Sequence, residues 1–222
     1  MTTTYPLRFE TGHLFVEFDG GKWLIDTGAP KTFGDRPFVI NGQRVEPSTG
    51  DRGLNAETLS QYVQVPCAGL IGADVLNRFD HLFDVTAKTL TVSTETLSHR
   101  GTVTGLEFLM GIPIVTAWIG GRDHRMFFDT GAQLSYLQED ALTGFPAAGN
   151  FEDFYPGIGP FRVETHRVGM TVGGIQISLR TGALPGALGT ALMMARTTGI
   201  ISNAVLEDRV VGYFPRRGQL VL

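Results

Sequence analysis

Two aspartates in this chain stand in matching sequence contexts. Asp26 follows the apolar run 23–25, Asp129 follows the apolar run 126–128, and each aspartate opens the tetrapeptide Asp-Thr-Gly-Ala. An apolar run of this kind is typical of a buried strand, and burying a lone carboxylate at its end is costly. The repetition therefore indicates that two similar halves bring two carboxylates together.

Paired carboxylates have a defined chemistry. Two carboxyl groups held close together cannot both ionise easily, so they share one proton, and one acts as a base while the other acts as an acid. The base can take a proton from water while the acid protonates a carbonyl oxygen. This hydrolyses an amide without a metal or a covalent intermediate. The pKa values belong to the pair, and the sequence does not assign the two roles to Asp26 and Asp129.

The residues after each aspartate suit a tight, stiff loop. Glycine permits a sharp turn and close approach of another backbone, threonine supplies a small hydroxyl that can hydrogen-bond across a symmetry axis, and alanine adds no further polar group. The predicted supporting residues of the two loops are Thr27, Gly28, Ala29, Thr130, Gly131 and Ala132.

The order of elements around the tetrapeptides also repeats. Each half contains a hairpin, the tetrapeptide, a middle section, an apolar-apolar-small stretch leading into a short helix (70–76 and 200–206), and a closing hairpin. Abundant glycine and only 18% charged residues favour strands and turns over long helices. A repeat of this size indicates a duplicated domain. The predicted lobes are residues 1–97 and 98–222.

This ordered set resembles the aspartic peptidases of the pepsin and retropepsin type. The resemblance is carried by the two tetrapeptides and by the stretches 70–76 and 200–206. It implies an all-β fold of two pseudo-symmetric closed-barrel lobes with short helices around a central cleft. It also implies that Asp26 and Asp129 are catalytic, that the substrate is a peptide or protein, and that one chain, as a monomer, supplies both halves of the site.

A glycine-rich segment of the second half resembles a retropepsin flap. By this resemblance it would fold over a bound peptide, which would pair with it as an added strand; an ordinary Gly/Pro loop is the alternative. The nearest first-half counterpart is a hairpin turning at Asn41-Gly42. The candidate flap and substrate-binding residues are Tyr155, Pro156, Gly157, Ile158, Gly159 and Pro160.

One residue departs from the family pattern. Ser202 stands where the family has glycine, while the first half has Gly72. Two other hypotheses therefore stay open. The first is a catalytically impaired peptide-binding module on the same scaffold, favoured by Ser202 and by the unequal flaps. The second is a structural β-protein in which the two aspartates lie far apart.

Composition excludes several other classes. A net charge of −4 does not favour nucleic-acid binding, and no apolar run is long enough to span a membrane. The five histidines lack zinc-site spacing, so we expect neither a metal nor a cofactor. Cys67 is the single cysteine and is interpreted as a structural thiol. With no signal peptide at the start, the expected location is the cytoplasm.

Overall fold

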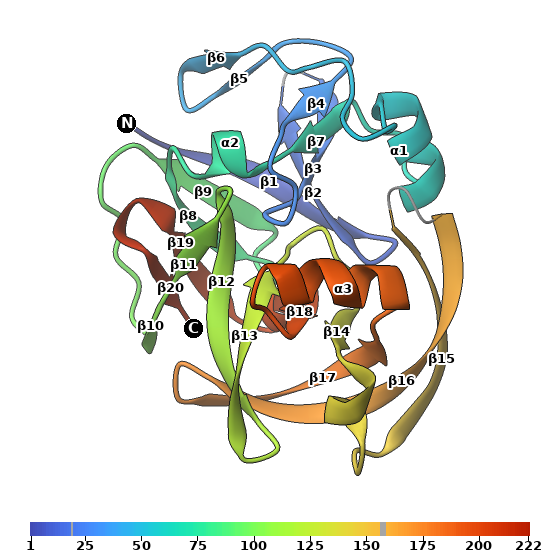
Figure 1. Ribbon diagram of the computed structural model, residues 1–222. Coiled ribbons are helices and arrows are strands. Elements are labelled where there is room, and N and C mark those ends of the chain that lie inside the picture. Colours follow the sequence, from blue (N-terminus) through green and yellow to red (C-terminus); the bar gives the residue numbers. More distant parts are fainter. Residues whose placement is uncertain (19, 156–158) are drawn as a thin grey trace.

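Strands dominate the protein, which confirms the all-β prediction. The computed structural model describes residues 1–18, 20–155 and 159–222. Its strands form a ten-stranded sheet, an eight-stranded sheet and a small hairpin of two strands, and three short helices lie on the outside (Figure 1).

The ten-stranded sheet runs in the order β10-β20-β19-β8-β9-β1-β2-β3-β7-β4. Its strands are β1 (Thr2–Glu10), β2 (His13–Phe18), β3 (Gly21–Ile25), β4 (Phe33–Gly34), β7 (Gly69–Ile71), β8 (Asp80–Asp84), β9 (Thr89–Ser93), β10 (Val103–Gly105), β19 (Val210–Phe214) and β20 (Gln219–Val221). The separate hairpin is β5 (Phe38–Ile40) and β6 (Gln43–Val45), so the predicted turn at Asn41-Gly42 is confirmed.

The eight-stranded sheet runs in the order β11-β12-β13-β18-β14-β17-β16-β15. Its strands are β11 (Glu107–Leu109), β12 (Ile112–Ile119), β13 (Arg122–Phe128), β14 (Ser135–Leu137), β15 (Ala147–Tyr155), β16 (Gly159–Val172), β17 (Ile175–Ala183) and β18 (Gly199–Ile201). An additional pairing between β12 and β16 joins the two ends of the run β12-β13-β18-β14-β17-β16, and β11 and β15 lie outside this run. The first-half strands pair in a linear order among the described residues, so a closed barrel there stays a prediction.

The helices are short; α1 is amphipathic, and α2 begins beside the first aspartate loop, where the N–H of Ala73 donates to the carbonyl of Ala29. They are α1 (Ala56–Val63), α2 (Ala73–Leu76) and α3 (Gly186–Met194). Asn55 caps α1: its side chain accepts from the backbone N–H of Thr58, whose hydroxyl accepts from the N–H of Asn55. This reciprocal pair satisfies two of the free donors at the helix start. No helix in the described part of the chain is long and apolar enough to cross a membrane.

The internal repeat is visible in the strand register. β3 runs parallel to β7, with Ile25 opposite Ile71, and β13 runs parallel to β18, with Phe128 opposite Ile201. Each aspartate follows directly after the strand that leads into it. The two halves therefore present their tetrapeptides from equivalent positions.

The second half contributes strands to the sheet of the first. β19 pairs antiparallel with β8, β20 pairs with β19, and β10 pairs with β20. The division into lobes 1–97 and 98–222 stays a prediction, since the ten-stranded sheet combines strands from both ranges. This shared sheet joins the halves beneath the aspartates.

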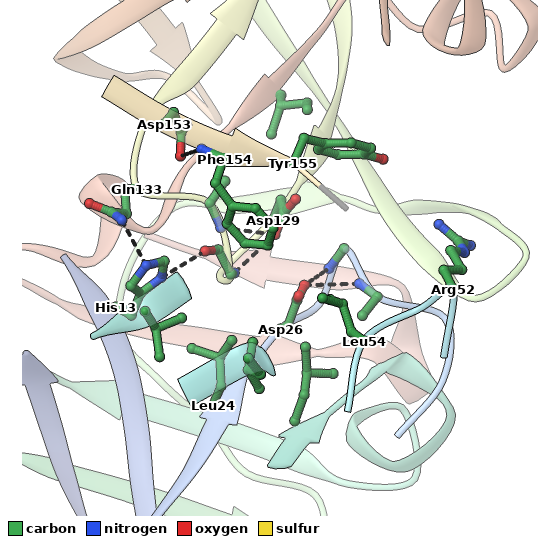
Figure 2. A pocket seen from close by; sticks show the side chains of 18 of the residues that line it. His13, Leu24, Asp26, Arg52, Leu54, Asp129, Gln133, Asp153, Phe154 and Tyr155 are labelled. Atoms are coloured by element: carbon green, nitrogen blue, oxygen red, sulfur yellow. Dashed lines mark hydrogen bonds between the residues drawn. The ribbon is translucent and has the colours of Figure 1, made fainter. Parts of the chain in front are cut away.

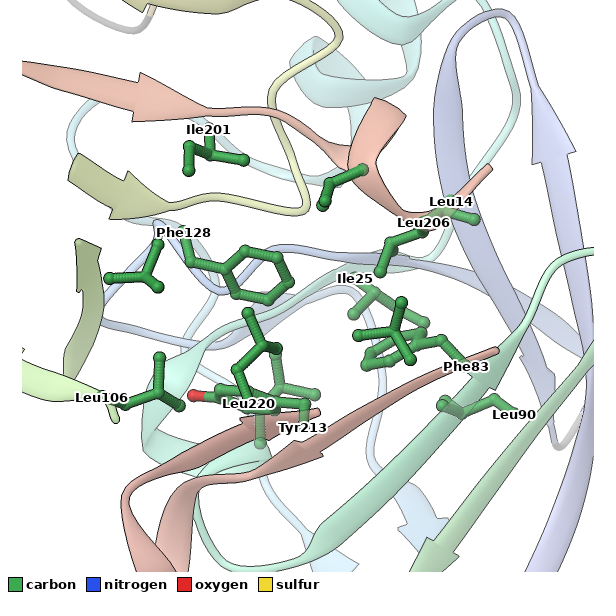
Figure 3. Packing of buried hydrophobic residues seen from close by; sticks show 14 of the residues in the cluster. Leu14, Ile25, Phe83, Leu90, Leu106, Phe128, Ile201, Leu206, Tyr213 and Leu220 are labelled. Atoms are coloured by element: carbon green, nitrogen blue, oxygen red, sulfur yellow. The ribbon is translucent and has the colours of Figure 1, made fainter. Parts of the chain in front are cut away.

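One hydrophobic core runs through both halves. Ile25, Phe128 and Tyr213 are buried in the same cluster (Figure 3), and the rings of Phe128 and Tyr213 are 5.9 Å apart at their centroids. Burying a large apolar side chain contributes about 1.5–3 kcal/mol. The residues that immediately precede the two aspartates are thus anchored in the core that both halves share.

A buried ion pair also joins the chain's closing hairpin to the first half. Asp80 in β8 is fully buried and accepts from Arg216 Nε at 3.0 Å and from Arg217, both in the turn between β19 and β20. The backbone N–H of Leu97 donates to the same carboxylate at 3.0 Å. Removing one partner of such a group leaves the others without compensation.

We expect Asp80→Asn to lower the free energy of unfolding by about 2–4 kcal/mol. The substitution removes the buried negative charge that pairs with two partly exposed arginines. Urea unfolding followed by fluorescence measures the change. Glu46→Gln is the matched control, because Glu46 pairs with Arg44 where both side chains are about two-thirds exposed, and it should cost less than about 1 kcal/mol. Equal losses in the two variants would contradict this role for Asp80.

Candidate active site

The two aspartates lie at equivalent strand ends. The backbone N–H of Asp26 donates to the carbonyl of Ile71 at 3.1 Å, and the N–H of Asp129 donates to the carbonyl of Ile201 at 2.9 Å. Each bond continues the parallel strand pair by one residue, so the neighbouring strand holds the backbone of each aspartate in place. The two apolar runs therefore form strands, as predicted, and each strand places one aspartate at its end.

The structure brings Asp26 and Asp129 together. A Cβ atom at Gly28 would lie 2.3 Å from Cγ of Asp129, and a Cβ at Gly131 would lie 2.4 Å from Cγ of Asp26. Each glycine thus makes room for the carboxyl group of the opposite half. The hypothesis of a structural β-protein with distant aspartates does not agree with this geometry.

Backbone donors hold both carboxyl groups in the same way. Oδ1 of Asp26 accepts from the N–H groups of Gly28 and Ala29, both at 2.9 Å. Oδ1 of Asp129 accepts from Gly131 at 2.9 Å and from Ala132 at 3.2 Å. Four backbone N–H groups therefore orient the pair and stabilise negative charge on it.

Burial and mutual repulsion make the pair hold a proton. Burial, followed by the negative charge of Asp129, raises the pKa of Asp26 well above its usual range, while the N–H groups of its loop oppose that rise. Burial also raises the pKa of Asp129. Since two adjacent carboxylates cannot both ionise easily, the pair keeps one proton to a higher pH than an isolated aspartate would.

The two threonines cross between the halves. The hydroxyl of Thr27 donates to the carbonyl of Phe128 at 2.6 Å and accepts from the N–H of Thr130 at 3.0 Å. The hydroxyl of Thr130 donates to the carbonyl of Ile25 at 2.9 Å and accepts from the N–H of Thr27 at 3.1 Å. Both side chains are fully buried. These four bonds lock the two loops to each other.

Ser202 has a structural role of its own. Its backbone is extended, with φ −79° and ψ 174°, so it does not need glycine. Its N–H donates to Oγ of Ser135 at 3.1 Å, and the two serine hydroxyls lie 3.0 Å apart. In the first half, the N–H of Gly72 donates to Oγ1 of Thr32, which donates to Asp74 at 2.6 Å. Ser135 in the second half thus corresponds to Thr32 in the first. The Ser202 hydroxyl is the partner of the Ser135 hydroxyl, as the Asp74 carboxylate is the partner of the Thr32 hydroxyl.

Glycine is required at the first-half position for a different reason. A Cβ at Gly72 would lie 2.7 Å from the carbonyl oxygen of Ala29 and equally close to Lys31. The first loop therefore runs tighter against its neighbouring strand than the second. The departure from the family pattern at Ser202 is local and leaves the hydrogen-bonded support of Asp129 in place.

A histidine of the first half supports the loop of the second. His13 is buried, its Nδ1 lies 3.1 Å from the carbonyl oxygen of Gly131, and its Nε2 lies 2.7 Å from the side-chain nitrogen of Gln133 (Figure 2). Burial lowers the pKa of His13 to about 4. A neutral imidazole that donates from Nδ1 and accepts at Nε2 fits both contacts. Asn203 adds a bond to the carbonyl of Gly12 at 2.8 Å.

A cavity of about 140 Å³ opens above the aspartates, both of which line it. Tyr155, at the end of β15, lines it from the other side (Figure 2). Leu24 and Leu54 contribute apolar surface from the first half. The carboxyl pair therefore faces a partly open cavity whose lining is mostly apolar.

The candidate flap belongs to the hairpin of β15 and β16. Tyr155 pairs with Gly159, and Pro160 pairs with Phe154. Pro156, Gly157 and Ile158, the predicted tip, lie outside the described residues. Tyr155, Gly159 and Pro160 belong to this hairpin, which both a flap and an ordinary Gly/Pro loop would contain. The flap and its substrate-binding role therefore stay predictions.

The flap hairpin reaches the first half through an aromatic stack. The rings of Phe154 in β15 and Tyr62 in α1 lie 3.9 Å apart and are parallel within 4°. In Figure 1 the hairpin of β15 and β16 rises beside the sheet and ends near α1. The hairpin of β15 and β16 therefore contacts the first half through α1.

Several residues around the site were not identified from the sequence. His13, Gln133 and Tyr62 act through contacts between distant parts of the chain. Tyr136 and Asp153 line the cavity as well, and the hydroxyl of Tyr136 donates to the carboxylate of Asp153. An alignment of the two halves would have indicated Tyr136, because it lies seven residues after its aspartate, as Phe33 does.

Comparisons with known proteins give a weak structural likeness. No protein-family model matches the chain, and no curated protein matches it. Among solved structures it is similar to a chain of the foamy viral protease-reverse transcriptase in complex with an RNA/DNA hybrid, with a TM-score of 0.34 and 16% identity. The match covers 42% of this chain and 11% of that chain.

Thr27→Val should lower the free energy of unfolding by about 2–4 kcal/mol, because it leaves the buried carbonyl of Phe128 and the buried N–H of Thr130 without a partner. Thr27→Ser keeps the hydroxyl and should cost about 1 kcal/mol for the lost methyl group. Denaturant unfolding of both variants measures the difference. A valine variant as stable as the serine variant would show that the crossed hydrogen bonds do not stabilise the loops.

A double-mutant cycle tests the bridge between flap and α1. Tyr62→Ala and Phe154→Ala should show a coupling energy of about 0.5–1.5 kcal/mol in thermal or urea unfolding, since stacked rings contribute that much beyond their buried area. Additive losses would mean that the two rings stabilise the protein independently. Tyr62→Ala with Phe151→Ala is a control pair, because Phe151 lies on the same strand and contacts Arg180 instead.

Proposed function

We propose that this protein is an aspartic endopeptidase that hydrolyses peptide bonds with a water molecule activated by Asp26 and Asp129. The observation that carries the proposal is the matched support of the two carboxyl groups. Each accepts two backbone N–H bonds at Oδ1, each lies against the glycine of the opposite loop, and crossed threonines join the loops. Purely structural turns would not require two carboxyl groups to share this buried position.

The chemistry follows from one proton shared by two groups. The ionised carboxylate takes a proton from water, the water oxygen attacks the peptide carbonyl carbon, and the protonated carboxyl group gives its proton to the carbonyl oxygen. The tetrahedral intermediate then breaks its C–N bond as one carboxyl group gives its proton to the amine nitrogen. The other carboxylate takes a proton from a hydroxyl group of the intermediate, which becomes the carboxylic acid product. The net reaction adds one water across the peptide bond, and the pair returns to its singly protonated state.

The partly open cavity supports a peptide or protein substrate bound in an extended form. Tyr155 faces the dyad from the flap hairpin, and the strand edge near it offers backbone groups to an added strand. One chain carries both aspartates, so we propose that a monomer is sufficient for activity. Arg52 lies at the rim of the same cavity and is exposed (Figure 2).

A peptide-binding module without catalysis is the competing function. In the sequence, Ser202 favours this alternative, because the aspartic peptidase pattern has glycine at that position. The hydrogen bonds between Ser202 and Ser135 explain that serine as part of the loop support. A peptide-library digest separates the two functions: products that disappear with pepstatin support the peptidase, and binding without cleavage between acid and neutral pH supports the module.

We expect Asp26→Asn and Asp129→Asn each to lower kcat by a factor of about 10²–10⁴ or more, because each variant loses one of the two proton-transfer groups. Mass spectrometry of the peptide digest measures the loss. Asp123→Asn, an exposed aspartate on the strand that leads to Asp129, is the control and should leave the rate unchanged. A dyad variant that is folded and cleaves at the wild-type rate would falsify the proposal.

The pH profile should be bell-shaped. Activity falls at low pH as both carboxyl groups become protonated, and it falls at high pH as the shared proton is lost. Since burial and the charge of Asp129 raise the pKa of Asp26, the high-pH limb should lie above the usual range of an aspartate. Initial rates of cleavage between pH 3 and pH 8 measure this, and a profile that rises with a single limb through pH 8 would contradict a shared proton.

A further inference from the structure

The two walls of the cavity are related by the internal repeat. Phe33 lies on β4 opposite Leu70, and Tyr136 lies on β14 opposite Ile200. Each of these rings lies seven residues after its aspartate, and both line the cavity. The two walls therefore stand on either side of the dyad, where the side chains flanking a scissile bond would bind.

The first wall is apolar around Phe33, while Asp51 and Arg52 of the same half also line the cavity. Phe33 packs in a buried cluster with Leu24, Leu59, Val63 and Leu70, all of which line the cavity. None of these side chains offers a hydrogen-bonding group. A substrate side chain on this side would gain mainly from burial of apolar surface.

The second wall carries a carboxylate. The hydroxyl of Tyr136, itself only 4% exposed, donates to Oδ2 of Asp153 at 2.5 Å, and the N–H of Phe154 donates to Oδ1 at 2.8 Å. Asp153 is half-buried. It pairs with Phe161 across the hairpin of β15 and β16, and Phe161 also lines the cavity. Each carboxylate oxygen keeps room for a further donor.

Asp153 forms no ion pair with any lysine or arginine in the described part of the chain. Among the ion pairs of the described residues, no lysine or arginine lies within 4.0 Å of its carboxylate. Burial raises its pKa, and the bond from Tyr136 opposes that rise. A partly buried carboxylate without a cation is costly to keep, and a cationic group entering the cavity would reduce that cost.

We propose that this cavity selects peptides with a lysine or arginine on the second-lobe side of the scissile bond and an apolar residue on the other side, and that Asp153 is the residue that selects the cation. The proposal rests on the proposed peptidase function. A hydrogen bond between charged groups in such a site should favour the basic peptide by a factor of about 10 or more over an isosteric neutral one.

Matched peptides test the selection. One set places lysine, norleucine or glutamate at the first position on either side of a scissile bond whose other flank is leucine, and kcat/KM is measured for each peptide. Lysine should exceed norleucine by about tenfold or more on one side only. In Asp153→Asn the ratio should fall close to one. Glu152→Gln, which neutralises the exposed neighbour on the same strand, should keep the wild-type ratio.

A binding measurement keeps this test separate from the peptidase proposal. Calorimetry with reduced-amide analogues of the lysine and norleucine peptides needs no cleavage, so it decides the selection even if every peptide stays intact. Tyr136→Phe retains the carboxylate and should retain the preference, which distinguishes loss of the carboxylate from general damage to the wall. Equal affinities of the wild-type protein for both analogues, or equal loss of preference in Glu152→Gln and Asp153→Asn, would overturn the proposal.

Discussion

The repulsion between Asp26 and Asp129 is the constraint on which the rest of the site depends. Two like-charged groups in contact and out of bulk water are unfavourable unless one binds a proton and donors surround the other. The loop N–H groups provide those donors, and the glycines provide the space. Because the loops would otherwise separate, the crossed threonines and the shared core beneath them hold the carboxyl groups in contact.

The internal symmetry is closest at the floor of the cleft and decreases away from it. The aspartates, glycines and threonines match one another bond for bond. One step outward, Asp74 supports the first loop while Ser202 supports the second. Further out, helix α1 of the first half contacts the hairpin of β15 and β16. Phe33 lines the cavity in the first half, while Tyr136 with its carboxylate partner lines it in the second. A proton-sharing pair needs two equivalent groups, whereas recognition of a directional peptide benefits from unlike walls.

Local structure followed the sequence closely. The hairpin at Asn41-Gly42 formed as predicted, because a turn depends on residues within a few positions of each other. The ten-stranded sheet was not predicted to combine both halves. That pairing joins β8 to β19, more than a hundred residues later, and hydrophobic periodicity carries no information about which distant strands meet.

The sequence by itself determined the all-β class and the repeated Asp-Thr-Gly-Ala context, since both depend on local composition and on a pattern that occurs twice. Only the tertiary structure decided that the two carboxyl groups touch, that His13 supports the opposite loop, and that Asp153 lines one wall without a cation. These features depend on contacts between residues that are distant in the chain. The physical reason is that packing and desolvation act between neighbours in space, whatever their separation in sequence.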